Sequence, residues 1–239
     1  MPPGFPGFPP EGMAFLRALV KNNRREWFQP RKPVYEEKVK APMHDLVLRV
    51  TSAMLEFAPA YAGDPEKAIF RIYRDTRFSK DKTPYKTHIA AVFHRRGLNM
   101  HGGAGLYFAV SAKEVEVAGG IYMPAPDTLR AVRTHVAEHH EDFRSLIGNR
   151  ALRRLLGDMQ GEQLTRVPKG FPVDHPAADL LRYKQFLFYI LLDPAIASTP
   201  KLEQEVIKRF RALTPFLEFL NAPLARAAKK RPLLPMGWN

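Results

Sequence analysis

The residues with the most evident chemistry form a dense run of positive charge between residues 71 and 86. This run reads RIYRDTRFSKDKTPYK and holds six cationic side chains against two aspartates. Like charges a few ångströms apart repel one another unless an anion lies between them. Guanidinium groups bind phosphate or carboxylate through two parallel hydrogen bonds. The run therefore predicts a site for an anionic ligand.

We expect this site to be a pocket whose cations come from the run and from two later positions. The predicted anion-binding residues are Arg71, Arg74, Arg77, Lys82, Lys86, Lys169 and Lys184. Asp75 lies among the arginines, where it can neutralise one of them and orient its guanidinium group. The turn around Pro84 would present Lys82, Lys86 and the Tyr85 hydroxyl to the same place. The same charges also fit a second interpretation, in which they form surface ion pairs with Asp75, Asp81 and neighbouring acids.

Two residues are candidates for proton transfer if the protein catalyses a reaction, namely His175 and Tyr85. His175 lies in a loop rich in proline and glycine, and loops on a rigid scaffold often hold acid or base groups. In the alternative interpretation His175 is a satisfied turn residue, and Asp174 caps the helix that begins near Pro176. The sequence indicates no particular cofactor and does not decide whether the protein is an enzyme.

A further group of histidines lies at the end of a predicted helix. His135 and His139 are four residues apart, with Glu138 and His140 beside them. Two imidazoles at this spacing can hold zinc. The His-Glu-x-x-His arrangement and an evident third ligand are absent, so we interpret the group as an exposed polar helix face and expect no metal site.

The positive charge is concentrated in patches. The net charge is +13, and three segments carry the whole of this excess, namely Lys21–Lys40, Arg71–Arg96 and Arg226–Arg231. Such patches indicate either a small anionic ligand in a pocket or a nucleic acid along a stripe, with aromatic residues such as Trp27 contacting bases. A general basic surface and a Trp27 that merely anchors the core are the plainer alternatives. Asp75 favours the pocket, because a carboxylate on a phosphate track is repulsive.

Hydrophobic periodicity indicates one α+β domain. Apolar residues recur at helical spacing, and alternate in four segments typical of strands. The predicted helices span residues 10–20, 35–54 and 127–154 and follow Thr199-Pro200, and the predicted strands span 88–94, 105–111, 114–121 and 182–192. We therefore expect a single domain over residues 1–222, with a mainly antiparallel sheet packed by N- and C-terminal helices. Residues 223–239 are predicted to form a basic, partly ordered tail.

Composition excludes several classes of protein. There is no cysteine, so disulfides and thiolate metal sites are excluded. No apolar run approaches the roughly 18–20 residues that a membrane helix needs, so no membrane partner is expected. The N-terminus lacks the pattern of a secretory signal, which predicts a cytoplasmic protein. The sequence gives no indication of the oligomeric state.

Several motifs in order resemble one known family. The central pattern is Arg71-x-x-Arg74-Asp75-x-Arg77-Phe78 followed by Asp81-Lys82-x-x-Tyr85-Lys86. Other matching stretches are FPGFPPEGMAFLRAL, NNRREWF, GGIYMP and VPKGFPVDHPAADLLRYK. Together they resemble domain-of-unknown-function family 2461, a family of bacterial conserved hypothetical proteins, over the chain up to about Leu220. The resemblance implies an intracellular single domain and supplies no catalytic residues.

Overall fold

The computed structural model describes residues 4–98 and 102–230, with side chains described as far as Arg226. Its sheet is an antiparallel meander in the order β1-β2-β3-β4. The strands are β1 (His88–His94), β2 (Gly105–Ser111), β3 (Val115–Ile121) and β4 (Phe186–Leu192). The predicted α+β class and the predicted strands are confirmed, and the first two strands begin and end where the alternation predicts. The strand predicted over residues 114–121 begins one residue later, at Val115, and the strand predicted over residues 182–192 begins four residues later, at Phe186.

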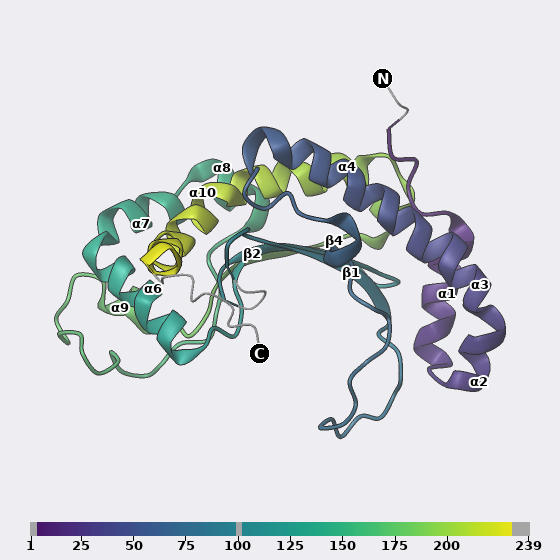
Figure 1. Ribbon diagram of the computed structural model, residues 1–239, viewed down its shortest axis with the longest axis horizontal. Coiled ribbons are helices and arrows are strands. Elements are labelled where there is room, and N and C mark those ends of the chain that lie inside the picture. Colours follow the sequence, from purple (N-terminus) through teal and green to yellow (C-terminus); the bar gives the residue numbers. More distant parts are fainter. Residues whose placement is uncertain (1–3, 99–101, 231–239) are drawn as a thin grey trace, which may run out of the picture.

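Helices precede and follow the sheet strands in the chain. The N-terminal group is α1 (Pro10–Lys21), α2 (Arg25–Phe28), the 3-10 turn η1 (Gln29–Arg31), α3 (Lys32–Tyr35), the π-helical turn η2 (Glu36–Lys40), α4 (Ala41–Phe57) and α5 (Pro65–Ala68). Between β3 and β4 lie α6 (Pro126–Glu138), α7 (His140–Ile147), α8 (Arg150–Leu156) and α9 (Ala178–Leu181). The 3-10 turn η3 (Pro194–Ser198) and the long helix α10 (Lys201–Lys230) complete the chain. Figure 1 shows α4 and α10 side by side on one face of the sheet.

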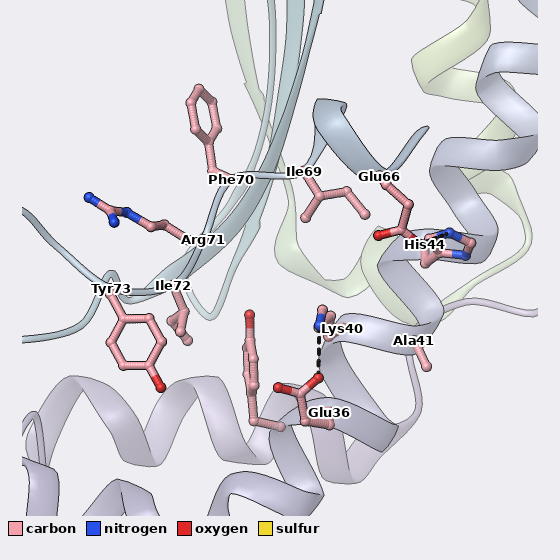
Figure 2. Close-up of a pocket in the computed structure, with 11 residues that line it drawn as sticks. Glu36, Lys40, Ala41, His44, Glu66, Ile69, Phe70, Arg71, Ile72 and Tyr73 are labelled. Atoms are coloured by element: carbon pink, nitrogen blue, oxygen red, sulfur yellow. Dashed lines mark ion pairs between the residues drawn. The ribbon is translucent and has the colours of Figure 1, made fainter. Parts of the chain in front are cut away.

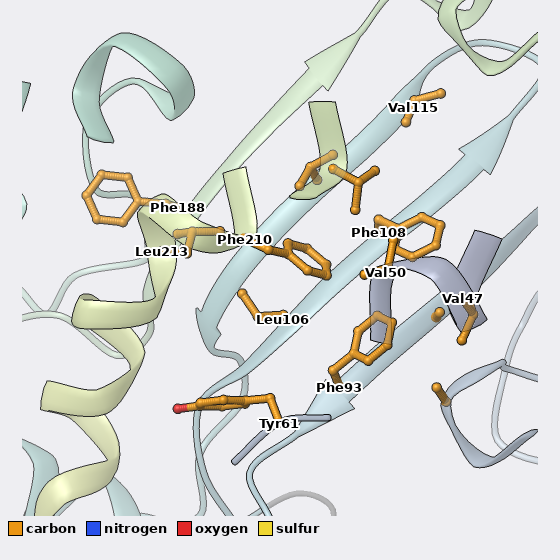
Figure 3. Packing of buried hydrophobic residues seen from close by; sticks show 14 of the residues in the cluster. Val47, Val50, Tyr61, Phe93, Leu106, Phe108, Val115, Phe188, Phe210 and Leu213 are labelled. Carbon is orange, nitrogen blue, oxygen red and sulfur yellow. The ribbon is translucent and has the colours of Figure 1, made fainter. Parts of the chain in front are cut away.

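The main core lies between that face and these two helices. Among the alternate strand residues, Phe93 and Phe108 meet Phe210 of α10 and Phe188 meets Phe216 of the same helix, and each of these rings is at most 3% exposed. Val47 and Val50 of α4 lie in the same cluster (Figure 3). The other residues of each strand point to the opposite face, which α4 and α10 leave uncovered. We call this second surface the open face.

Asn221 fixes α10 against the segment that enters β2. Its side chain is fully buried and makes three hydrogen bonds. The amide oxygen accepts from the Ala104 N–H at 2.8 Å, and the amide nitrogen donates to the Ala104 carbonyl at 2.9 Å and to the Tyr61 hydroxyl at 2.8 Å. A buried polar side chain is tolerated because all three bonds are made.

Two predictions about helices need correction or remain untested. The predicted helix over residues 127–154 is wrong as one element, because the backbone leaves helical angles at His139 and Asn149 caps a new helix by accepting from Ala151 and Leu152. The predicted boundary at residue 222 falls inside α10, whose Leu224 is 9% exposed. Residues 231–239 of the predicted tail lie outside the described residues, so the division into domain and tail stays a prediction.

Candidate functional site

The basic run forms an irregular antiparallel ribbon beside β1. Isolated bridges pair Ile69 with Ala91 and Tyr73 with Tyr85. The Lys86 N–H donates to the Ile72 carbonyl at 2.8 Å. We call residues 69–86 the basic ribbon; in Figure 1 it projects from the β1 edge of the sheet. The ribbon is neither a regular strand nor a helix. The positions of its cationic side chains are therefore not set by strand or helix periodicity.

Tyr85 anchors the base of the basic ribbon. Its ring is 1% exposed and stacks on Phe28 of α2 with centroids 4.1 Å apart. Asn23 accepts from the Tyr85 N–H at 3.0 Å and donates to its carbonyl at 2.8 Å. Burial raises the pKa of the Tyr85 hydroxyl. Tyr85 therefore packs in the core and lines neither cavity described below, which argues against the predicted role in proton transfer.

Two of the predicted arginines are already paired with aspartates of the ribbon. Arg74 donates to Asp81 at 2.5 Å and to the Thr83 hydroxyl. Hydrogen bonds from the Thr83 N–H and from Arg74 lower the pKa of Asp81 to about 2. The Arg77 guanidinium donates two hydrogen bonds to Asp75, at 3.0 and 2.7 Å, and these bonds lower the pKa of Asp75 to about 2. The ion-pair interpretation thus describes the tip of the ribbon.

Lys86 and Arg71 have a different environment. Among the described residues, neither cation makes an ion pair with a carboxylate, and Asp75 attracts Arg71 only over a longer distance. The Lys86 ammonium lies over the Phe70 ring, 4.4 Å from its centroid. Partial burial, and then the charge of Arg71, lowers the pKa of Lys86. Both effects would be relieved by an anion bound between these two cations.

The remaining predicted residues do not join this pair. Lys82 is exposed and donates to the Thr76 carbonyl at 2.9 Å. Lys184 forms an exposed ion pair with Glu162 at 3.2 Å. Lys169 and His175 belong to the loop before α9, which Figure 1 shows near the left end of the molecule, far from the basic ribbon. The structure thus gives Lys82, Lys184 and His175 partners apart from Lys86 and Arg71.

His175 has a local structural role. Its Nδ1 accepts from the Ala177 N–H at 3.0 Å, which stabilises the turn into α9. The ring lies against His140, with centroids 5.9 Å apart. This geometry matches the alternative interpretation of His175 as a satisfied turn residue.

A first cavity, which we call the helix-side cavity, lies between the ribbon and the N-terminal helices. Its volume is about 540 Å³, and Arg71 is the predicted site residue that lines it. The other charged groups in it are paired, Lys40 with Glu36 at 3.0 Å and His44 with Glu66 at 2.8 Å. Figure 2 shows Phe70 and Arg71 pointing away from the Lys40–Glu36 pair. Most cations that line the helix-side cavity are thus already paired, which makes it a poor site for an anion.

A second cavity, which we call the open-face cavity, lies on the open face of the sheet. Its volume is about 550 Å³. Cross-strand pairing places Val92, Tyr107, Ala118 and Tyr189 in one row across the four strands. The cavity is lined by this row together with Phe70, His94, Gly103, Gly105, Glu116, Gly119, Gly120, Tyr122 and Leu187. Phe70 connects the cavity to the ribbon, because its ring centroid lies 6.5 Å from that of Tyr107 on one side and 4.4 Å from the Lys86 ammonium on the other.

Glu116 is the carboxylate of the open-face cavity. It is partly buried between Ala109 and Leu191 of the neighbouring strands. No residue in the described part of the chain gives it a hydrogen bond or an opposite charge. Burial raises its pKa, and the nearby Glu114 carboxylate raises it further. Burial also raises the pKa of Tyr107. The cavity therefore combines an apolar aromatic wall with one carboxyl group that no described residue pairs.

Sequence reasoning missed this cavity, although a signal was present. In the alternating patterns of β2 and β3, Tyr107 and Glu116 fall between the apolar residues that face the core. Outward residues of a fully solvated sheet are usually charged or polar, whereas here they are mostly small or aromatic. That contrast on three adjacent strands pointed to a surface that holds a ligand or a partner.

The histidines at the end of α6 also differ from their prediction. His135 is 8% exposed and packs against Phe219 of α10, with ring centroids 4.5 Å apart. The predicted exposed polar face is therefore wrong for His135, because α10 covers this part of α6. Glu138 and His139 are exposed, as predicted.

These observations define a single α+β domain with a ligand-sized cavity on the uncovered face of its sheet. The sequence model of the family described as "Conserved hypothetical protein (DUF2461)" matches residues 11–219. The chain belongs to this family, as the motifs around the basic ribbon predicted. No curated protein and no solved structure matches the chain. Within the described residues, every helix is too short or too polar to cross a membrane.

Proposed function

We propose that the protein binds a small organic anion, with its apolar or planar body in the open-face cavity and its phosphate or carboxylate between Lys86 and Arg71. The observation that carries this proposal is the environment of Lys86. Its ammonium is partly buried against Phe70, with a lowered pKa and no carboxylate partner among the described residues. Leaving a partly buried cation unpaired is costly, and an anionic ligand would offset that cost.

The lining of the cavity supports a small-molecule ligand. A volume of about 550 Å³ falls in the range of roughly 300–1,000 Å³ that is typical of ligand sites. Tyr107, Tyr189 and Phe70 offer flat apolar surfaces, and few polar groups are present. This combination is typical of sites where apolar contacts give affinity and a few polar groups fix orientation.

Glu116 supports a further feature of the ligand. Its carboxyl group lacks a partner in the described part of the chain and its pKa is raised. A hydroxyl or amino group on the ligand would satisfy it by donating a hydrogen bond. His175 and Tyr85 do not line this cavity, so the proposal is one of binding and assigns no reaction to either residue.

A thermal-shift experiment with chosen probes tests the proposal. We expect phenyl phosphate and benzoate to raise the melting temperature saturably at moderate salt, and more than inorganic phosphate does. Lys86→Gln should abolish most of this shift. Lys82→Gln is the matched control, because Lys82 lies in the same ribbon but is exposed, and it should retain the shift. Equal shifts for the Lys86→Gln and wild-type proteins would contradict the proposed anion site.

Single-stranded nucleic acid is the second candidate ligand. Tyr107 and Tyr189 lie in one row, two strands apart, on a four-stranded antiparallel sheet. Aromatic residues on such a sheet can stack against successive bases. Glu116 beside this row would repel phosphates, which makes this candidate the weaker one.

Salt dependence separates the two candidates. Binding of a labelled oligonucleotide should weaken steeply with salt concentration, in proportion to the number of phosphates contacted. Binding of phenyl phosphate involves one anionic group and should depend on salt much less. Tight oligonucleotide binding that Tyr107→Ala removes would favour the second candidate over the first.

A further inference from the structure

A cluster of three potential metal ligands lies where α6 ends and α7 begins. His135, Glu138 and His139 each offer one ligand atom, and these atoms all lie within 4.8 Å of one another. The rings of His135 and His139 meet with centroids 4.5 Å apart. In a tetrahedral zinc site with bonds of about 2.1 Å, ligand atoms lie roughly 3.4 Å apart. Small side-chain rotations would bring these three groups to that spacing.

The environment of His135 is the second observation that points to a ligand. The residue is 8% exposed, no hydrogen bond to its ring exists within the described residues, and its ring nitrogens are not completely shut off from solvent. A ring nitrogen is therefore free of other partners and can be reached by an ion from solvent. Phe219 packs against the ring and holds it, with centroids 4.5 Å apart. A metal ion would satisfy the imidazole nitrogen that faces His139.

We propose that His135, Glu138 and His139 bind a divalent transition-metal ion, with Zn²⁺ as the best match. Two imidazoles and a carboxylate are ligands that zinc takes readily, whereas Mg²⁺ and Ca²⁺ prefer oxygen atoms alone. Glu138 and His139 are exposed, so the site opens to solvent and leaves a fourth position for water. None of the three residues lines the open-face cavity, and the proposal is independent of the anion site.

Two neighbouring residues make the proposal specific. Arg226 of α10 lies close enough to affect His135, and its charge opposes a bound cation. His140 follows His139 directly, but its ring lies against His175 instead. We therefore expect Arg226→Gln to strengthen zinc binding, and His140→Ala to leave it unchanged.

A zinc titration of the full chain, carrying no histidine tag, tests the site. Competition with a chromophoric chelator should give one Zn²⁺ per chain for the wild type. His139→Ala and Glu138→Gln should each weaken binding by about tenfold or more, and both positions are exposed enough for the fold to survive. His140→Ala is the matched control and should bind as the wild type does.

A Co²⁺ titration supplies a spectroscopic measurement of the same site. We expect visible absorption bands of a four-coordinate ion in the wild type, and their loss in the His139→Ala variant. Absence of stoichiometric Zn²⁺ binding by the wild type up to about 100 μM, which is far weaker than typical protein zinc sites, would overturn the proposal. Equal affinities of His139→Ala and wild type would overturn it as well.

Discussion

The two faces of the sheet are built from alternate residues of the same four strands, yet they differ in burial and in the side chains they carry. On the packed face, Phe93, Phe108 and Phe188 are buried under α4 and α10. On the open face, Tyr107 and Tyr189 stay partly exposed, and Glu116 lies among them without a partner in the described residues. Burial of the packed face thus contributes to the free energy of folding. The open face is free to carry groups that would be costly in a core.

This difference separates residues that specify the fold from residues that offer chemistry. The strand pleat sends neighbours in the sequence to opposite faces. Gly119 meets Leu213 of α10 on the packed face, whereas Ala118 lies between two tyrosines on the open face. Variants at matched positions on the two faces therefore test the comparison directly.

The largest expected effect is the loss of an aromatic ring from the packed side. Phe210 is fully buried against Phe93 and Phe108, with ring centroids 5.6 and 6.2 Å away. Phe210→Ala should cost about 3–5 kcal/mol of unfolding free energy, because it leaves a cavity. The melting temperature should fall by about 10 °C. Tyr189→Ala on the open face should cost under about 1 kcal/mol. If urea unfolding showed similar losses of unfolding free energy for Phe210→Ala and Tyr189→Ala, the proposed difference between the two faces would be wrong.

A smaller effect is expected from adding volume at neighbouring positions. A Cβ on Gly119 would lie 2.8 Å from Leu213 Cδ1 and 3.2 Å from Leu217 Cδ1. Gly119→Leu should therefore destabilise the fold by about 1–3 kcal/mol through overpacking. Ala118→Leu should leave the melting temperature nearly unchanged but reduce the thermal shift caused by phenyl phosphate, because it fills part of the open-face cavity. A larger loss of stability for Ala118→Leu would show that this face is packed.

The smallest expected effect concerns the pH dependence of stability. The folded state raises the pKa of Glu116 above its usual value of about 4.5, mainly through burial. Its contribution to stability is therefore full at pH values below 4.5 and is lost as the pH rises through the folded-state pKa. Glu116→Gln should accordingly raise the melting temperature at pH 7 by about 2 °C.

The pH series supplies its own control. The difference between Glu116→Gln and the wild type should shrink as the pH falls towards 4, where the wild-type carboxyl is protonated. Glu114→Gln should recover a smaller part of the gain, because Glu114 is the lesser cause of the shift. A difference that grows at acid pH would contradict the raised pKa.

Much of the fold could be predicted because local periodicity specifies it. Alternation located β1 and β2 to the residue, since each strand has one buried side. The helix predicted over 127–154 was too long because its apolar spacing continues across breaks made by the backbone at His139 and by the Asn149 cap. A hydrophobic stripe therefore predicts which residues are buried more reliably than it predicts where a helix ends.

The site was harder to predict because pairing in a ribbon depends on loop geometry. The sequence correctly marked the basic run as unusual, but it could not show that Asp81 reaches Arg74 while the Lys86 ammonium lies over the Phe70 ring. Counting charges treats these cations as equivalent. In the folded protein these cations differ because each contacts a different neighbour. The residues that meet in this way are spaced along the sequence with neither a helical nor a strand period.

The three hydrogen bonds of Asn221 affect whether binding at one proposed site can change the affinity of the other. Helix α10 contacts both β3, beneath the open face, and α6, which carries His135. Sliding α10 along its axis would break hydrogen bonds away from water, at about 1–3 kcal/mol for each group left unsatisfied. These hydrogen bonds therefore oppose a shift of α10 through which one occupied site could bias the other. Zinc and an organic anion should therefore bind with additive free energies, so that neither ligand changes the affinity of the other.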